Sequence, residues 1–158
     1  MSSYPEIRWT EDYIALTELA RHPRVYPSIS DDTFADPMSF SCFADRRYVG
    51  VFTDKGLRGY ISVKEDGEAH LAFHPDLWGR GAVKLASRMI DFIFENSEIE
   101  DLWACVFDTN LSTIRLIQMC GATYAPQHDR ELYQGGALRR LFGFELRGAT
   151  KCHRQFQP

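Results

Sequence analysis

Three short apolar runs in the middle of the chain, separated by turn sequences, place the strongest limit on its fold. The runs span residues 47–53, 57–63 and 68–74, and the turns 54–56 and 65–67 lie between them. Asp-x-Gly and Asp-Gly sequences between such runs are typical of hairpins. The pattern therefore predicts an antiparallel β-meander.

The spacing of apolar residues changes immediately after the meander. In residues 82–95 they recur at helical intervals with charged residues on the opposite face, which predicts an amphipathic helix. We expect a buried strand over 101–107 and a short helix over 111–120. Asn110 is expected to cap the start of this second helix and Gly121 to terminate it.

Both ends of the chain carry weaker patterns. Before the meander we expect a strand over 6–9, a helix over 11–22 capped by Thr10, and a short helix between loops within 24–41. After the second helix we expect closing strands over 122–124, 131–133 and 138–146.

The order of these elements is β, helices, β-β-β, helix, β, helix and closing strands. This order predicts an α/β fold with a mixed, mostly antiparallel sheet flanked by helices, rather than a doubly wound parallel sheet. Because 158 residues are enough to bury one core, we expect a single domain over 1–158.

The composition excludes several classes of protein. A formal net charge of −4 argues against a general nucleic-acid-binding protein, which would normally be basic. No positively charged start precedes an apolar run, and no stretch approaches the roughly 20 apolar residues that cross a bilayer. We therefore expect a cytoplasmic protein without nucleic-acid or membrane partners.

The four cysteines, Cys42, Cys105, Cys120 and Cys152, stand far apart in the sequence. None belongs to a C-x-x-C pair, and Cys105 and Cys120 have apolar neighbours. This favours free, buried thiols over disulfides or a metal site. No metal is expected.

Gly79, Arg80 and Gly81 stand where the meander stops and the helix over 82–95 starts. Such a junction leaves helix N–H groups open to a ligand, and the helix dipole favours phosphate at this end. Arg80 and Lys84 add positive charge. The unit is a candidate pyrophosphate cradle, although a tight turn before an ordinary helix explains the same residues. A dinucleotide fingerprint would need a glycine in place of Lys84, and no P-loop sequence is present.

Two stretches, HPDLWGRGAVKLASRMIDFIFE and LWACVFDTNLSTIRLIQMCGA, resemble the GNAT superfamily of acyl-CoA-dependent N-acetyltransferases. The first contains His-Pro followed by the loop 77–81, and the second contains N-x-x-[S/T]-I-R from Asn110 to Arg115. They look most like the branch that acetylates the N-termini of ribosomal proteins and its small-molecule relatives. The resemblance covers about residues 47–147, and the N-terminal third carries no motif.

The resemblance implies acetyl-CoA as co-substrate. The pyrophosphate would be held by the loop and the helix start, namely by Trp78, Gly79, Arg80, Gly81, Ala82, Val83 and Lys84. The pantetheine arm would lie between the strands 68–74 and 101–107 and would bind Asn110. The N–H near Phe73 would bind the thioester carbonyl, whose oxygen becomes negatively charged during attack.

Transfer to an amine also needs a base that accepts a proton from the ammonium. Glu68 and His70 are the first candidates, because they lie two residues apart and hence on one face of their strand. The unperturbed pKa of histidine suits this task. Glu68 would need a raised pKa or a bridging water, and a solvated strand end beside a turn explains it without a catalytic role. Asp108 is a third candidate.

The leaving thiolate needs an acid. Many family members use a tyrosine on the second helix, where this chain has Ile117. The ribosomal-protein branch places a serine at the position of Thr113, so the resemblance points to the Thr113 hydroxyl. Val83 is a second departure, because relatives usually have alanine or glycine there.

We therefore predict an N-acetyltransferase that moves an acetyl group from acetyl-CoA to a primary amine by direct attack in a ternary complex. The acceptor is expected to be a protein N-terminus or a small-molecule amine, and its identity and the oligomeric state stay open. Ile117 and Val83 are the reasons for an alternative prediction. In it, the chain is a GNAT-like protein without turnover that acts as a binding or assembly component, for example in a virus. A CoA-binding regulator is a third interpretation.

Overall fold

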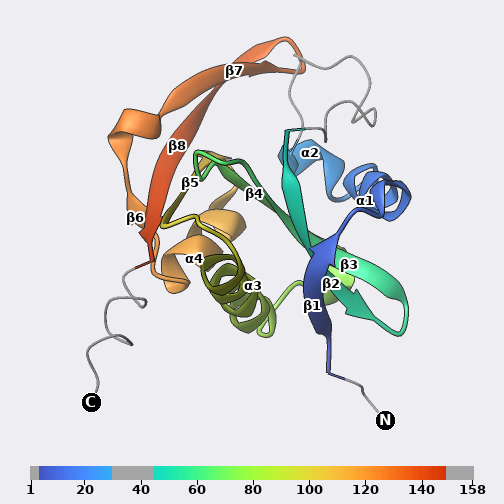
Figure 1. Cartoon of the computed structure of the whole chain (residues 1–158). Helices are drawn as coiled ribbons and strands as arrows, with labels where there is room; N and C mark the ends of the chain where they lie inside the picture. The colour runs from blue at the N-terminus through green and yellow to red at the C-terminus, as the bar shows by residue number, and fades with distance from the viewer. Residues whose placement is uncertain (1–3, 30–44, 149–158) are drawn as a thin grey trace, which may run out of the picture.

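The structure is a computed structural model that describes residues 4–29 and 45–148. Two antiparallel sheets meet at one point and carry helices against their faces (Figure 1). This arrangement confirms the expected mixed α/β fold. Cys42, Cys152 and the greater part of the segment 24–41 lie outside the described residues.

The first sheet is the predicted meander with the N-terminal strand added. Its order is β1 (Glu6–Thr10), β2 (Arg47–Thr53), β3 (Gly56–Val63) and β4 (Ala69–Phe73), each antiparallel to the next. The tight turns fall within 54–56 and 65–67, as the Asp and Gly residues predicted.

The second sheet is built around the long strand β8 (Ala137–Arg147). β5 (Asp101–Phe107) pairs along one side, and β6 (Thr123–Tyr124) and β7 (Arg130–Gln134) pair along the other. The hairpin of β7 and β8 reaches across to the N-terminal region (Figure 1). There the Gln134 side-chain amide donates to the Pro27 carbonyl at 2.8 Å.

The α-helices of the described part are α1 (Tyr13–Ala20), α2 (Tyr26–Ile29), α3 (Ala82–Asn96) and α4 (Leu111–Met119), with 3₁₀ turns at η2 (Pro75–Leu77) and η3 (Pro126–His128). α1 is shorter than predicted, and its N-cap is Asp12 rather than Thr10. The Asp12 carboxylate accepts the Ala15 N–H at 3.1 Å. No helix in the described ranges is long and apolar enough to cross a membrane.

Helices α1 and α3 cover opposite faces of the first sheet. Met89 and Ile93 of α3 are fully buried and pack with Val49 on one face. Leu16 of α1 is fully buried on the other face, where it packs with Tyr48. The alternation of buried side chains along β2 therefore supplies both halves of the core.

The two sheets meet at a parallel bridge between Glu68, just before β4, and Trp103 of β5. At this point the Trp103 N–H donates to the Gly67 carbonyl at 3.0 Å. Beyond the bridge β4 and β5 are not paired, so they diverge. Gly67 suits this junction because its φ is +90° and because a Cβ there would overlap the carbonyl oxygen of Asp101.

Replacing Gly67 with alanine should lower the free energy of unfolding by about 2–4 kcal/mol, because it adds an unfavourable φ and a clash with Asp101. Gly56→Ala is the matched control: its φ is +89°, but the space around its Cβ position is open. The control should lose only about 1–2 kcal/mol. Urea unfolding measures both variants, and equal losses would contradict a close contact between the sheets at Gly67.

Candidate functional site

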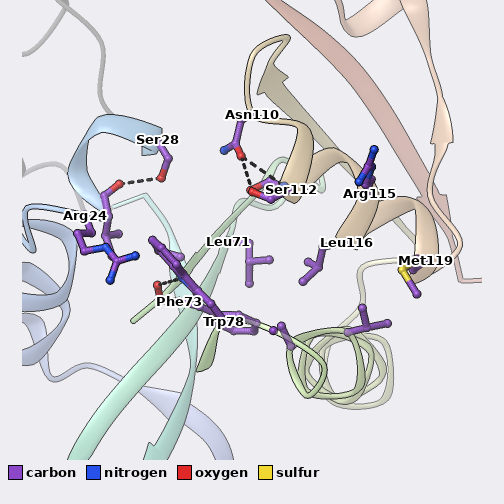
Figure 2. Close-up of a pocket in the computed structure, with 16 residues that line it drawn as sticks. Arg24, Ser28, Leu71, Phe73, Trp78, Asn110, Ser112, Arg115, Leu116 and Met119 are labelled. Carbon is purple, nitrogen blue, oxygen red and sulfur yellow. Dashed lines mark hydrogen bonds between the residues drawn. The ribbon is translucent and has the colours of Figure 1, made fainter. Parts of the chain in front are cut away.

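A cavity of about 440 Å³ lies beside the edge of β4 that faces away from β3. Its walls come from β4, the start of α3, the helix α4 and the segment around α2. Figure 2 shows Leu71 of β4 and Leu116 of α4 pointing toward one another in its middle, with Asn110 and Trp78 on opposite sides. The cavity therefore occupies the region where the two sheets separate.

The edge of β4 that borders this cavity carries backbone groups that do not bond to β3. In an antiparallel pair, alternate residues direct their N–H and C=O groups toward the partner strand. The Glu68 carbonyl does so, because it accepts the Lys64 N–H at 3.0 Å. The His74 N–H does so as well, because it donates to the Arg58 carbonyl at 2.7 Å. The N–H groups of Leu71 and Phe73 consequently point away from β3, toward the gap.

The loop between β4 and α3 is held to the strand by a tryptophan. The Trp78 indole N–H donates to the Phe73 carbonyl at 2.9 Å (Figure 2). Gly79, next in the loop, has φ +108° and open space around it. Gly81 has an ordinary φ of −79° and is also open, so no backbone or packing reason in this fold requires a glycine there.

The start of α3 lacks the side-chain cap that the neighbouring helices have. Asp12 caps α1 and Asn110 caps α4, but the N-cap of α3 is Gly81, with no side-chain hydrogen bond. The first N–H groups of a helix have no partner within the helix. This end of α3 therefore presents unsatisfied donors and the positive end of its dipole beside the cavity.

The predicted donor-site residues fall into two groups. The cavity is lined by Phe73, Trp78, Gly79, Ala82, Val83 and Asn110. Arg80, Gly81 and Lys84 do not line it but are exposed at the start of α3. From this position Arg80 and Lys84 can reach a ligand at the start of α3 only from the solvent side of the cavity.

Asn110 is the N-cap of α4, as the sequence predicted. Its side-chain oxygen accepts the Thr113 N–H at 3.3 Å and the Ser112 hydroxyl at 3.2 Å. Thr113 lines the large cavity together with Asn110. Ile117, one turn further along α4, lines a second, smaller cavity instead.

Glu68 is held by three partners. Its carboxylate accepts hydrogen bonds from Arg46 at 3.3 Å, from Lys64 at 3.4 Å and from Nε2 of His70 at 2.9 Å. The hydrogen bond from His70 and the neighbouring positive charges hold the pKa of Glu68 well below its usual range, although burial opposes them. Glu68 is therefore ionised, and a base weakened in this way suits proton abstraction poorly.

The same pair determines how His70 is oriented. An ionised carboxylate only accepts hydrogen bonds, so Nε2 of His70 must carry the shared proton. In the neutral ring the lone pair then resides on Nδ1. His70 is 43% exposed, and it lines the small cavity rather than the large one. Glu68 lines neither cavity.

Arg24 was not identified from the sequence. Its guanidinium lies 4.8 Å from the centre of the Trp78 ring, a cation–π contact, and it lines the large cavity with Arg115. Arg24 belongs to the segment without a motif, so only its charge could have marked it. The charged residues of the cavity lining are these two arginines.

The two described cysteines, Cys105 and Cys120, are free thiols. Burial raises the pKa of both. The Cys105 thiol donates to the His128 carbonyl at 3.0 Å. Within residues 4–29 and 45–148, no three His, Cys, Asp or Glu side chains are grouped closely enough to hold a metal ion.

Comparison with known proteins identifies the family. The profile described as Acetyltransferase (GNAT) domain matches residues 7–123. The spermidine N-acetyltransferase from Vibrio cholerae, crystallised with CoA and spermine, has a TM-score of 0.73 at 16% identity, covering 92% of this chain and 96% of that one. The yncA protein from Salmonella typhimurium, with its cofactor acetyl-CoA, has a TM-score of 0.68 at 20% identity, covering 92% and 95%. No curated protein sequence matches significantly.

The two structural likenesses show a shared fold, and the profile match extends over more than half of the chain. It includes the unpaired edge of β4, the glycine junction and the whole of α4. The chain therefore belongs to the GNAT acetyltransferase domain family.

Proposed function

We propose that this acetyltransferase moves the acetyl group of acetyl-CoA to a primary amine in a ternary complex. The observation that carries the proposal is one cavity that joins the unpaired edge of β4 to the uncapped start of α3. These features match the two ends of the donor, an extended arm with amide groups and a pyrophosphate. The solved structures of similar fold, which hold CoA or acetyl-CoA, support it.

In this proposal the backbone supplies most of the contacts to the donor. The open N–H groups between Gly79 and Val83 bind the pyrophosphate; the Ala82 N–H is not one of them, because it donates to the Gly79 carbonyl at 3.1 Å. Arg80 and Lys84 add positive charge outside the cavity. The arm contacts Asn110 and reaches the unpaired edge of β4 at its last residue, Phe73. The Phe73 N–H donates to the thioester carbonyl, where it stabilises the charge that develops as the amine attacks.

The side chains move two protons. The attacking nitrogen loses one to Nδ1 of His70, which Glu68 orients through Nε2 at 2.9 Å. The N–C bond forms, the C–S bond breaks, and the departing thiolate takes a proton from the Thr113 hydroxyl, which regains one from solvent as His70 releases its own. Glu68, predicted as a base, is here a positioning residue because its carboxylate stays ionised.

The acceptor is a primary amine of a protein N-terminus or of a small molecule. The loop 77–81 and the Asn110–Arg115 motif favour the branch that acetylates ribosomal-protein N-termini. The spermidine N-acetyltransferase of similar fold supports an amine acceptor in general. The alternative is a GNAT-like binding protein without turnover, which the absence of a hydroxyl at Ile117 favours.

Titration calorimetry with acetyl-CoA tests the donor site, with two substitutions at one position. Gly81→Asp should weaken binding at least tenfold, because it places a carboxylate beside the phosphates. Gly81→Asn is the matched control with nearly the same shape and no charge, and it should retain most of the affinity. Because Gly81 has an ordinary φ of −79° and open space around its Cβ position, both variants should fold like the parent. Equal affinities of the two variants would argue against a phosphate at this junction.

The pH dependence of turnover separates the roles of Glu68 and His70. His70→Gln should lower kcat about 100-fold and abolish the acidic limb of the pH–rate profile, because it removes the base. The Glu68→Gln variant should still show an acidic limb in its pH–rate profile, because the imidazole of His70 remains. An unchanged pH–rate profile in His70→Gln would show that His70 is not the base.

An amine screen monitored by thiol release supplies the assay, and binding of acetyl-CoA without thiol release under all conditions would favour the alternative without turnover.

Glu68→Gln also has a predicted effect on stability. Because the pKa of Glu68 is lowered in the folded state, its stabilisation is present above the ordinary carboxyl value of 4.5 and is lost as the pH falls toward the lower folded value. The variant should therefore unfold more easily than the parent at pH 7, and the difference should shrink below about pH 4. Thermal unfolding across this range measures it, and a difference that is independent of pH would contradict the ion-pair role.

The Thr113 hydroxyl is tested with two substitutions of similar size. Thr113→Val removes the hydroxyl and should lower kcat about 100-fold with little change in the KM for acetyl-CoA. Thr113→Ser keeps the hydroxyl and should retain turnover. The backbone N–H of residue 113, which donates to the capping Asn110 side chain, is present in both variants. Full turnover of the valine variant would show that another group is the acid.

A further inference from the structure

A second cavity of about 70 Å³ adjoins the large one. The two share Leu71 of β4 and Leu116 of α4 in their linings. The small cavity continues between Ile90 of α3, Leu102 of β5 and Ile117 of α4. Apart from His70, Trp103, Cys120 and Glu145, its lining residues have purely hydrocarbon side chains.

The position of this cavity along β4 relates it to the proposed donor. The large cavity borders the strand from Leu71 to Phe73, next to the glycine junction, whereas the small one borders it from Ala69 to Leu71. It therefore lies further from Gly79, toward the bridge at Glu68 and Trp103. A molecule that runs from Gly79 past Phe73 along β4 meets the small cavity with its far end.

The size and chemistry of the cavity fit a short hydrocarbon chain. One water molecule takes up about 30 Å³, so about 70 Å³ accepts roughly two heavy atoms. An apolar cavity of this kind gains little from holding water, but each methylene buried there would improve affinity about fourfold. An acetyl group ends in a methyl and leaves this space largely unfilled.

We propose that the small cavity accepts the end of an acyl chain longer than acetyl, so that thioesters of about three or four carbons, propionyl-CoA and butyryl-CoA, are donors. This rests on the proposed function, because it assumes that the thioester lies near Phe73. The transfer is otherwise the same: the amine forms an amide with the acyl carbon, the C–S bond breaks, and the thiolate gains a proton. The backbone N–H at Phe73 binds the same carbonyl whatever the chain length.

Calorimetry with CoA, acetyl-CoA, propionyl-CoA and butyryl-CoA tests the proposal on the full chain. Propionyl-CoA should bind at least as tightly as acetyl-CoA, and up to about fourfold more tightly. Ile117→Phe fills the small cavity and should weaken propionyl-CoA and butyryl-CoA by tenfold or more relative to acetyl-CoA. Ile117→Ala enlarges it and should shift the preference toward the longer chain. Leu111→Phe is the matched control on α4, because Leu111 is 60% exposed and lines neither cavity.

The possible outcomes separate this inference from the function on which it rests. Tight binding of acetyl-CoA with propionyl-CoA bound more than tenfold more weakly would overturn the inference and leave the donor site intact. Unchanged chain-length preference in both Ile117 variants would overturn the assigned location. Failure of CoA and all three thioesters to bind would overturn the proposed function and the inference together. Opposite shifts in Ile117→Phe and Ile117→Ala support it, since a merely destabilised fold would weaken all four ligands alike.

Discussion

The parallel bridge between Glu68 and Trp103 is the constraint on which the rest of the structure depends. Had pairing continued past it, β5 would satisfy the outward N–H and C=O groups of β4, and the two sheets would form one continuous surface. Because pairing stops there, the backbone groups of Leu71 and Phe73 face a gap. The cavity, the start of α3 and the helix α4 are all arranged around that gap.

Charge is concentrated at the same junction. The side chain of Glu68 is only 12% exposed, and burying an ionised carboxylate is unfavourable unless it is paired and hydrogen-bonded. Arg46, Lys64 and His70 provide these partners from three different segments. Glu68 thereby links the segment before β2, the end of β3 and β4 while it orients the imidazole. Glu68 therefore has two roles: it stabilises the sheet junction, and it orients His70 for the proposed proton transfer.

Much of the framework could be predicted because it is encoded by residues close together in the chain. The turns 54–56 and 65–67, the helical period of α3 and the cap at Asn110 all depend on interactions across a few residues. The choice of Asp12 over Thr10 as the cap of α1 was missed, because both residue types cap helices well. Which of them is used depends on where the chain leaves β1 to cross the sheet.

The sequence by itself determined the order of elements, the glycine junction before α3, and the family to which its motifs point. Only the tertiary structure decided that Glu68 is ionised and held by three partners, that Arg24 lies over Trp78, and that His70 borders a different cavity from Thr113. Periodicity shows which face of a segment is apolar, but not which distant segment will pack against it. Cavities and charge pairs arise from that packing, so they depend on contacts between residues far apart in the chain.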